Sequence, residues 1–538
     1  MVSYIFMASQ LCFSAVTCFY FWQLMRRGRA EKDAISKESS RELARLRDMR
    51  KIKLTEPLSE KTRPRSFSEI RGQARGKRAL SAALCGENPQ HILLYGPPGV
   101  GKTAAARAAL SEAAKNPASP FSKNAPFVEM DATTLRYDER GIADPLIGSV
   151  HDPIYQGAGA YGPGGIPQPK AGAVTRAHGG ILFLDEIGEL PPTQLNKLLK
   201  VLEDRRVFFE SAYYSRENRE IPRHIHDIFQ NGLPADFRLV GATTRPPEEL
   251  PPALRSRCTE VFFDALTRSE LTSIAAAAAE KSGFLAEEAA ISAISEYAEN
   301  GRDAVNLMQM AGSFAKCEGR KSVTEADILW VAETERYAKR PCPASLGTAR
   351  IGTVRALSVA GFSGFVTDIE AVAVFKKGEG SFSVSGAAET ETISLGARTL
   401  SRRGTALTAA ENALRFLENT FGINASDYEI HVNFPASVLA DGPSAGLAIL
   451  AALYSAIFHV PVPDTIAITG EITPRGAALP VGGILEKTAA AASAGIRTVY
   501  MPPDNAAAVS GEGVDCVGIP DAEALLSRLF PPCISPSA

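Results

Sequence analysis

Hydrophobic and polar positions divide the chain into five stretches with different patterns. Residues 1–25 carry no charged side chain, and residues 26–65 are polar with mixed charge. Residues 66–263 alternate short apolar strand patterns with glycine-containing turns and helical segments, whereas 264–343 are alanine-rich helices ending at a Pro-Cys-Pro break. Residues 344–538 combine β-branched strands with alanine-rich helices. The pattern predicts two α/β regions separated by a helical region.

The uncharged N-terminal segment predicts a transmembrane signal anchor. About 20 helical residues cross a hydrocarbon core of roughly 30 Å, and residues 1–25 reach that length, although several serines and glutamines make them only moderately apolar. Arg26, Arg27 and Arg29 follow the segment, whereas a cleavable signal peptide has its basic residues before the apolar run. We therefore expect a single-pass protein of the cell membrane, with 26–65 as a stalk and the catalytic domains in the cytoplasm. A buried N-terminal helix is the alternative.

Overall composition narrows the chemistry. Hydrophobic residues make up 45% and charged residues 22%, which is typical of globular proteins. The 58 basic and 60 acidic residues give a net charge of −2, so we expect no specific nucleic-acid binding. The eight cysteines form no C-x-x-C pair and the seven histidines form no H-E-x-x-H, which argues against a zinc enzyme.

A phosphate-binding loop follows the first apolar strand, His91–Tyr95. The sequence matches G-x-x-x-x-G-K-[ST] between that strand and a helix from Ala104, the context that the motif requires. Backbone N–H groups of such a loop surround phosphate, its lysine reaches the β- and γ-phosphates, and its hydroxyl ligates Mg²⁺. The predicted ATP-binding residues are Gly96, Pro97, Pro98, Gly99, Val100, Gly101, Lys102 and Thr103.

Two further strands complete the predicted nucleotide site. The strand in 181–186 ends in Asp185, expected to hold Mg²⁺ with Thr103, and in Glu186, expected to polarise the attacking water. The strand in 239–245 ends in Thr243 and Thr244, so one of these hydroxyls should lie near the same phosphates. Arg255, Arg257 and Arg302 lie downstream, and any one of them alone would be interpreted as a solvated surface group.

The order of these motifs resembles the AAA+ ATPases over residues 66–340. The resemblance implies ATP and Mg²⁺ as cofactors, Thr243 or Thr244 as sensor 1 and Arg302 as sensor 2 in a helical lid. It makes Arg257, or as second choice Arg255, the finger that acts on a neighbour's γ-phosphate, which requires a homo-oligomeric ring and implies a hexamer. Ile70–Gln73 matches the short family motif near the adenine.

The glycine- and proline-rich stretch 157–169 is expected to be a loop inside the first α/β region. It lies where AAA+ ATPases place pore loops. Tyr155 and Tyr161 are aromatic residues near glycines, and either could grip an unfolded chain or simply pack against the protein.

A second candidate chemistry lies in the last 190 residues. A strand in 429–434 precedes Ala440-Asp-Gly-Pro-Ser-Ala-Gly446, and an apolar helix is expected over 447–460. Ser444 is thus placed where a turn enters a helix, beside Gly442 and Gly446, where free N–H groups could form an oxyanion hole. The alternative is that Ser444 only caps the helix.

A serine nucleophile needs a base, and two candidates are present. Lys487 precedes an alanine-rich helix expected over 488–494, where loss of hydration would lower its pKa and allow it to act as the base of a Ser–Lys dyad. A Ser–His–Asp triad using His431 and Asp441 is the competing arrangement. On the local pattern alone, Lys487 could also be an ordinary surface lysine.

These motifs strongly resemble the proteolytic domain of the Lon proteases. Asp-Gly-Pro-Ser-Ala-Gly, with the lysine 43 residues after the serine (444 to 487) inside Gly-Gly-Ile-x-Glu-Lys, is a specific pair of motifs for that family. The resemblance implies Ser444 as nucleophile, Lys487 as base and Thr469 as a hydrogen-bond partner of the dyad. Ala440 stands where many members have lysine, which bears on substrate preference rather than on the dyad.

The layout of the whole chain is similar to the membrane-anchored Lon B proteases of spore-forming Firmicutes. Ordinary bacterial Lon has a long N-terminal substrate-binding domain, and this chain has the uncharged segment and stalk in that place. The resemblance also rests on the long run 208–237. It implies a role in sporulation and a place in the forespore membrane.

The expected fold class is therefore α/β: an AAA+ P-loop core with a helical lid, followed by an α+β Lon-type domain and preceded by a transmembrane helix. The expected function is ATP-dependent serine endopeptidase, which unfolds, translocates and degrades unfolded, damaged or regulatory proteins. Two rivals stay open. One is an AAA+ remodelling ATPase whose Lon-like domain is only a scaffold, and the other is a chaperone-like membrane tether.

Overall fold

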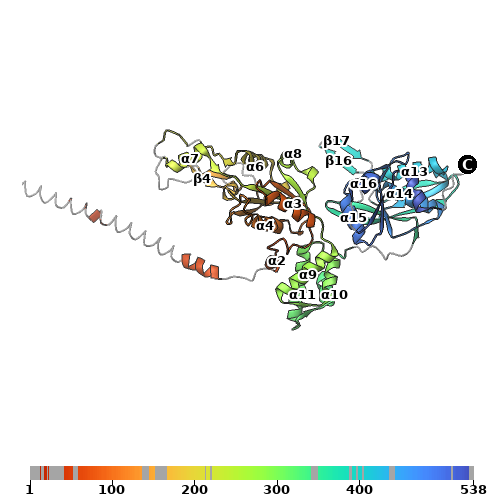
Figure 1. Cartoon of the computed structure of the whole chain (residues 1–538), viewed down its shortest axis with the longest axis horizontal. Helices are drawn as coiled ribbons and strands as arrows, with labels where there is room; N and C mark the ends of the chain where they lie inside the picture. The colour runs from red at the N-terminus through yellow and green to blue at the C-terminus, as the bar shows by residue number, and fades with distance from the viewer. Residues whose placement is uncertain are drawn as a thin grey trace, which may run out of the picture. The chain divides into compact units, whose positions relative to one another are not determined.

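The computed structural model divides into two units, residues 1–61 and residues 62–538 (Figure 1). The structure describes residues 13, 17, 19, 20, 22, 42–51, 58–135, 144–151, 166–211, 214–218, 221–340, 349–386, 391–395, 398–402, 405–434, 443–509 and 513–531.

In the N-terminal unit, the described residues are helical. Residues 42–51 form a helix within the expected stalk, and α2 (Leu58–Lys61) follows. Leu43, Leu46 and Met49 are exposed along one side of the first of these helices. Most of the predicted anchor lies outside the described residues, and no helix within the described part is long and apolar enough to cross a bilayer.

The first region of the larger unit is built on a five-stranded sheet whose paired strands all run parallel, in the order β2-β5-β8-β1-β9. Central strands of such sheets are buried on both faces and therefore read as continuous apolar runs. The Ile-Leu-Leu-Tyr of β1 is fully buried, as are the first four residues of β5. The strands are β2 (Phe127–Asp131), β5 (Ile181–Asp185), β8 (Arg238–Thr243), β1 (Ile92–Tyr95) and β9 (Thr259–Phe262).

Helices follow the strands of this sheet and place the nucleotide motifs at its carboxyl edge. The helix after β1 begins at Lys102, two residues before the start expected from the sequence. The helices are α3 (Ala74–Leu84), α4 (Lys102–Ala113), α5 (Ala173–Arg176), α6 (Pro192–Asp204), α7 (Arg223–Asn231) and α8 (Pro252–Arg255). β3 (Gly148–His151) and β4 (Gln168–Ala171) pair as an antiparallel hairpin. The last two residues of the loop expected over 157–169 therefore belong to β4.

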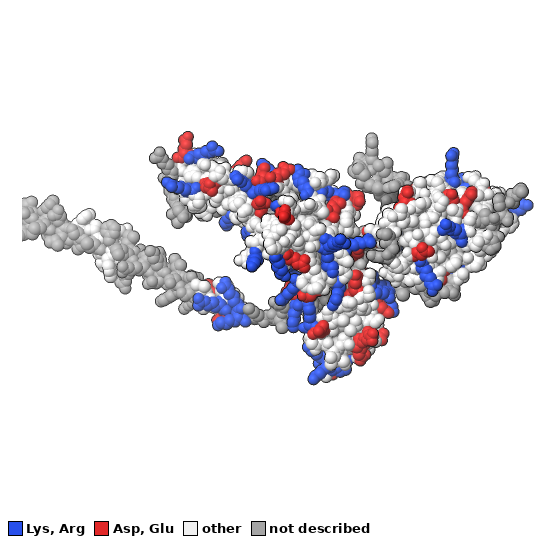
Figure 2. All heavy atoms as spheres, in the orientation of Figure 1, with Lys and Arg blue, Asp and Glu red and all other residues white. Residues whose placement is uncertain are grey.

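Four helices follow the sheet, in agreement with the expected helical region. They are α9 (Arg268–Ser282), α10 (Glu288–Tyr297), α11 (Gly301–Cys317) and α12 (Glu325–Thr334). Thr267 and Glu270 form a capping box that starts α9, and Asn300 caps α11 by accepting from the N–H groups of Arg302 and Asp303. Charged residues of both signs are interspersed on the face of this region in Figure 2.

The C-terminal region is built on a mixed seven-stranded sheet in the order β15-β18-β14-β13-β20-β23-β24. Its long hairpin, β13 (Thr353–Ala360) and β14 (Ser363–Phe375), is antiparallel. On the other side of β13, the neighbouring strands β20, β23 and β24 all pair in parallel. The other strands are β15 (Ser381–Ser385), β18 (Tyr428–Asn433), β20 (Ile466–Ile468), β23 (Thr498–Met501) and β24 (Asp515–Gly518).

The central helix of this region is α14 (Gly446–Phe458), which packs against β14, β13 and α13 (Thr405–Phe421). Every residue of α14 except Phe458 is buried, which explains why its sequence shows almost no polar face. The remaining helices are α15 (Ile484–Ser493), α16 (Pro503–Ala508) and α17 (Ala522–Leu529). A helix buried on all sides gives a fixed base for the turn at its N-terminus, where Ser444 lies.

Candidate active sites

The phosphate-binding loop connects β1 to α4 in a conformation that depends on its glycines. Gly96, Gly99 and Gly101 have φ angles of 147°, 72° and 97°, a region that other residues rarely adopt. Lys102 Nζ donates to the carbonyl oxygens of Gly96 at 2.6 Å and of Pro97 at 3.0 Å. The lysine thus closes onto the loop from the first turn of α4.

Two carboxylates at the end of β5 act on this lysine. Burial lowers the pKa of Lys102 to about 8, and the charges of Glu186 and Asp185 oppose that shift while Arg302 adds to it. Burial, and next the charge of Glu186, raise the pKa of Asp185. A buried carboxylate in this situation is stabilised in its charged form by a cation. The site therefore fits Mg²⁺, with Asp185 and the Thr103 hydroxyl as ligands.

The two threonines after β8 have different partners. Thr244 donates to Glu186 Oε2 from its backbone N–H and from its hydroxyl, both at 3.1 Å. Thr243 is fully buried, and its hydroxyl accepts from the backbone N–H of Arg245 at 3.0 Å. Of the two, Thr244 is the one that contacts the carboxylate expected to orient water.

The start of α11 lies against the phosphate-binding loop. The backbone N–H of Gly301 donates to the carbonyl of Gly99 at 3.3 Å, and a Cβ added to Gly99 would lie 2.5 Å from Asn300 Oδ1. Arg302 follows directly, is exposed, and its charge reaches Lys102. The structure therefore brings the expected sensor 2 residue to the loop. Asn300 was not predicted from sequence, although its place as an N-cap before Arg302 is a recognisable signal.

The motif Ile70–Gln73 also packs near this loop. Ile70 is buried, and its Cγ2 would lie 3.7 Å from a Cβ added to Gly101. Gln73 adopts φ 57° and exchanges two hydrogen bonds with the backbone of Asp264, at 2.6 and 2.9 Å.

Arg255 and Arg257, the two candidates for the finger, are both ion-paired within the chain. Arg255 donates from Nε to Glu260 Oε1 at 2.7 Å, and the Tyr95 hydroxyl donates to the same oxygen at 3.2 Å. Arg257 pairs with Glu203 and donates to the carbonyl of Ala253 at 2.8 Å. Arg257, unlike Arg255, also lines a cavity at the amino edge of the sheet.

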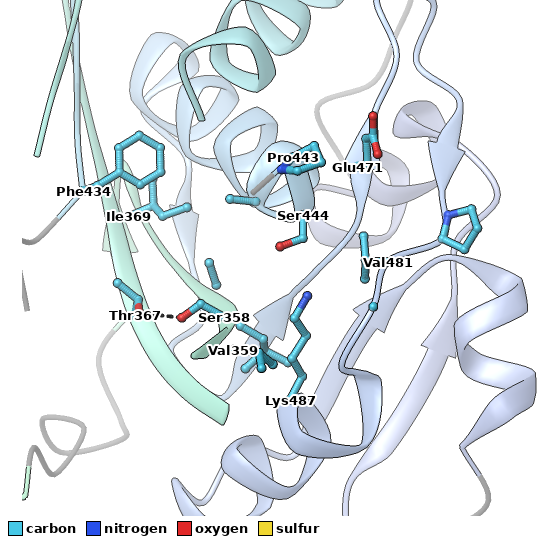
Figure 3. Close-up of a pocket in the computed structure, with 15 residues that line it drawn as sticks. Ser358, Val359, Thr367, Ile369, Phe434, Pro443, Ser444, Glu471, Val481 and Lys487 are labelled. Atoms are coloured by element: carbon cyan, nitrogen blue, oxygen red, sulfur yellow. Dashed lines mark hydrogen bonds between the residues drawn. The ribbon is translucent and has the colours of Figure 1, made fainter. Parts of the chain in front are cut away.

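A second cavity, of about 380 Å³, lies in the C-terminal region and contains both Ser444 and Lys487 (Figure 3). Figure 3 shows the serine hydroxyl and the lysine amine directed toward each other across it. The walls are largely apolar, with a few polar groups. They include Ala356, Leu357, Ser358, Val359, Thr367, Ile369, Phe434, Pro443, Ala445, Glu471, Pro480, Val481 and Gly482.

Ser444 is held by its backbone and leaves its hydroxyl to the cavity. It lies in the turn Pro443–Ala445, and the N-cap of α14 is Ala445, so the interpretation of Ser444 as a helix cap is not supported. The Ser444 carbonyl accepts from the N–H of Gly470 at 2.8 Å and from the hydroxyl of buried Thr469 at 3.4 Å. Thr469 thus contacts the main chain of Ser444 rather than its hydroxyl.

Lys487 lies inside α15, which begins at Ile484 and not at Thr488 as expected. Its side chain is 3% exposed. Burial lowers the pKa of Lys487 to about 8, opposed only by the charge of Glu486. A neutral amine is therefore accessible near physiological pH, as a general base requires.

The alternative triad is not assembled in the described residues. His431 lies on the exposed side of β18, and its ring nitrogens are hydrogen-bonded to Ser383 at 2.8 Å and to Ser385 at 3.0 Å. It does not line the cavity of Ser444. Asp441 lies outside the described residues, as do Ala440 and Gly442.

Other predicted residues cannot be placed, and some cavity residues were not predicted. Tyr155 and Tyr161 lie outside the described residues. Ser358 and Thr367 line the cavity, are buried, and have their hydroxyls 3.4 Å apart. Polar residues at inward-facing positions of two apolar strands are the signal that could have found them.

Comparison with known proteins identifies the family. The model of the Lon protease C-terminal proteolytic domain matches residues 338–512, and that of magnesium chelatase subunit ChlI matches residues 66–221. Lon protease 2 of Bacillus subtilis is 51% identical over 524 residues, which cover 97% of this chain and 95% of the relative. The chain belongs to the Lon protease family. It is an ATP-dependent serine protease of this family with an AAA+ core, and the scaffold-only alternative is not favoured.

More distant similarities were also found. The archaeal Lon protease of Methanothermobacter thermautotrophicus is 29% identical over 422 residues, covering 71% of this chain and 61% of the relative. Among solved structures, the RuvB Holliday junction branch migration motor of Thermotoga maritima is 23% identical, with a TM-score of 0.35. It covers 51% of this chain and 73% of that chain.

Proposed function

We propose that this Lon protease cleaves protein chains with a Ser444–Lys487 dyad and feeds them to it by ATP hydrolysis at the loop 96–103. The observation that carries the proposal is the cavity in which the serine hydroxyl faces a buried, low-pKa lysine (Figure 3). Ser444 does not cap α14, so a structural role in that helix does not explain why Ser444 and Lys487 face each other in the cavity.

The proteolytic step follows from this geometry. Neutral Lys487 takes the proton from Ser444 Oγ as that oxygen attacks the substrate carbonyl carbon. The ammonium then returns the proton to the leaving amine, and the C–N bond breaks to give an ester on Ser444. Water, deprotonated by Lys487, hydrolyses the ester and restores both side chains. Thr469 and Gly470 fix the backbone of Ser444 during these steps.

The nucleotide step uses the residues at the carboxyl edge of the first sheet. Lys102 would leave its loop carbonyls to contact the β- and γ-phosphates. Thr103 and Asp185 would hold Mg²⁺, which would supply positive charge to neutralise the phosphates. Glu186 orients the attacking water, and Thr244, which holds Glu186, is the better candidate for sensor 1. Arg302 reaches the phosphates from α11, and Arg257 acts on the nucleotide of a neighbouring copy.

The assembly and location are part of the proposal. A finger acting in trans requires a ring, for which we propose a hexamer. Tyr155 or Tyr161 would pull unfolded, damaged or regulatory proteins through it. We propose that residues 1–25 anchor the ring in the cell membrane, with the catalytic domains cytoplasmic, and in a sporulating cell in the forespore membrane. The basic residues 26, 27 and 29 support this orientation.

The decisive experiment compares the wild-type full-length chain with Ser444→Ala in detergent. Degradation of an unfolded protein should require Mg-ATP and should vanish in Ser444→Ala, while ATP hydrolysis stays near the wild-type rate. ATP hydrolysis without degradation in either form would contradict the proposal. The anchor is tested separately: full-length protein released from membranes by alkaline carbonate would show that residues 1–25 do not span the bilayer.

A further inference from the structure

A cavity of about 410 Å³ lies at the amino ends of the parallel strands in the first sheet. His91 directly precedes β1, Arg238 begins β8 and Thr259 begins β9, and all three line it. Arg205 and Arg257 complete its charged lining, and no carboxylate is among the lining residues. We refer to it as the basic cavity.

The basic cavity cannot serve the nucleotide of its own subunit. The phosphate-binding loop leaves the carboxyl end of β1, whereas His91 lies at the amino end of the same strand. β1 has four residues, which span about 13 Å at roughly 3.3 Å per residue. The two sites therefore lie at opposite edges of one sheet. Any phosphate that the cavity binds must come from outside this subunit.

The three arginines of the cavity differ in how firmly they are held. Arg238 donates to the carbonyls of Pro89 at 2.6 Å and Phe237 at 3.1 Å, and to Asp236 at 3.0 Å. These bonds hold the guanidinium of Arg238 in place within the fold. The Arg205 side chain is 65% exposed and has one loose ion pair, 3.7 Å from Asp236. Within the described residues, no hydrogen bond fixes its guanidinium.

The backbone at Arg205 is unusual for an arginine. It ends α6 with φ 53° and ψ 25°, the left-handed conformation in which glycine or asparagine is favoured at a helix end. A side chain there costs on the order of 1 kcal/mol. The position itself is fixed, because its N–H donates to Val201 at 2.8 Å and its carbonyl accepts from Ala235 at 3.0 Å. The structure thus keeps an arginine where glycine would be less strained.

The surroundings leave the cavity positive. His91 Nδ1 accepts from the N–H of Leu239 at 3.0 Å, and burial, with the charges of Arg238 and Arg205, lowers the pKa of His91 to about 4. The histidine is therefore neutral near pH 7, and the arginines are the charged groups of the lining. Asp236 faces Arg205 and Arg238, and Glu203 faces Arg257. Three cations against two carboxylates favour an anion with several charged oxygens.

We propose that Arg205 is a second catalytic arginine, which contacts the terminal phosphate of ATP bound by a neighbouring copy of this chain, beside Arg257. This rests on the proposed ring and on Arg257 as its finger. During hydrolysis, the water oxygen bonds to the γ-phosphorus as the bond to the β–γ bridging oxygen breaks, and charge is held on the γ-oxygens and on the leaving ADP. Arg205 stabilises that charge with its planar fork of donors.

The first test uses Arg205→Gly in the full-length chain. Glycine removes the guanidinium and relieves the left-handed backbone, so the melting temperature should be unchanged or higher. ATP hydrolysis should fall roughly 10- to 100-fold, less than the thousandfold or more that an arginine finger supplies. The affinity for ATP should stay within about twofold. The matched control is Arg206→Ala, an adjacent exposed arginine that donates to the Asn231 carbonyl at 3.4 Å and does not line the cavity.

The second test shows whether Arg205 acts on a neighbour. Lys102→Ala subunits lack the phosphate-binding lysine but keep Arg205, so mixing them with Arg205→Gly subunits should raise ATP hydrolysis above the sum of the separate rates. A rate equal to that sum would overturn the proposal. A wild-type chain that hydrolyses no ATP would instead refute the proposed function itself.

A free phosphate is the other source of the same chemistry. Inorganic phosphate titrated into nucleotide-free Lys102→Ala protein distinguishes it. Two results together would replace our assignment with a free-anion site. The Lys102→Ala protein would bind phosphate and lose that binding when Arg205→Gly is added, and the single Arg205→Gly variant would hydrolyse ATP at the wild-type rate.

Discussion

The two regions of this Lon protease each contain a buried lysine whose pKa is lowered to about 8, yet the two lysines are held differently. Lys102 is bonded to two loop carbonyls, and two carboxylates oppose the effect of burial. Lys487 lies inside an alanine-rich helix, and only the charge of Glu486 opposes the effect of burial on its pKa. Its amine is directed at Ser444 (Figure 3). Burial has the same effect on the pKa of both lysines, whereas their neighbours differ.

The difference indicates what each lysine does. Phosphate groups beside Lys102 would raise its pKa again, so in the proposed function it acts as a cation. The described residues that line the cavity of Lys487 include none of the phosphate-binding loop, so in the proposed mechanism its amine is free to lose a proton and act as a base. A lowered pKa therefore does not identify a general base by itself; the groups that face the amine decide the role.

The largest effect should come from Lys487→Met. Without the base, cleavage should fall at least 1,000-fold while ATP hydrolysis continues. Because the folded state lowers the pKa of Lys487 from 10.5 to about 8, it binds this proton more weakly than the unfolded chain does. The free energy of unfolding is therefore lower below pH 8 and rises between pH 8 and 10.5. At pH 7, burial of this lysine lowers the free energy of unfolding by roughly 3 kcal/mol. The methionine variant should melt at a higher temperature than the wild type, and Lys487→Arg, equally inactive, at a lower one.

Lys102→Met should separate the two sites further. ATP hydrolysis should fall at least 100-fold, and degradation of folded proteins with it, because a contact to the phosphates is lost. No gain in melting temperature is expected here, since the carbonyls of Gly96 and Pro97 lose their donor. A rise as large as that of Lys487→Met would contradict the distinction between the two lysines.

The pH dependence should differ between the two activities. Cleavage of a short unstructured peptide should rise about tenfold per pH unit from pH 6 toward 8 and level off above it, because the reactive form of Lys487 is neutral. The affinity for ATP should instead fall above pH 8, because a neutral Lys102 must take up a proton to bind phosphate. Steady-state kinetics and nucleotide titrations measure the two curves. Cleavage that does not vary with pH over this range would remove Lys487 as the base.

The smallest effect, about tenfold, is expected at Thr244. Thr244→Val removes the hydroxyl that donates to Glu186, so ATP turnover should fall while ATP binding is kept. Thr243→Val is the matched control: it loses the bond to Arg245 and about 1 kcal/mol of stability, with turnover unchanged. The reverse pattern would assign sensor 1 to Thr243.

Much of both sites could be predicted from the sequence, because their motifs combine local geometry with fixed chemistry. The strands before Gly96 and the apolar run ending in Asp185 both formed within a residue of the expected limits. Helix starts were less accurate: α4 and α15 begin earlier than expected. Lysine and leucine have good helical propensity, and the sequence alone does not show where the first turn is supported.

The contacts between distant segments could not be predicted. The choice between Thr243 and Thr244 depends on Glu186, which lies 58 residues before Thr244. Ser358 and Thr367 enter the cavity only because β13 and β14 pair in one register. Arg205 lines the basic cavity because α6 ends beside three strand starts. Each of these depends on packing across the sheet, which no local pattern encodes.

The attachment of Ser444 also has a consequence for newly made copies of the protein. The groups that hold its carbonyl, Thr469 and Gly470, and the lysine that faces it are all synthesised after it. A ribosome-bound chain that has just exposed this serine therefore carries an ordinary alcohol. In the proposed mechanism, a copy can therefore cleave other chains only after Lys487 has been synthesised and has folded against Ser444.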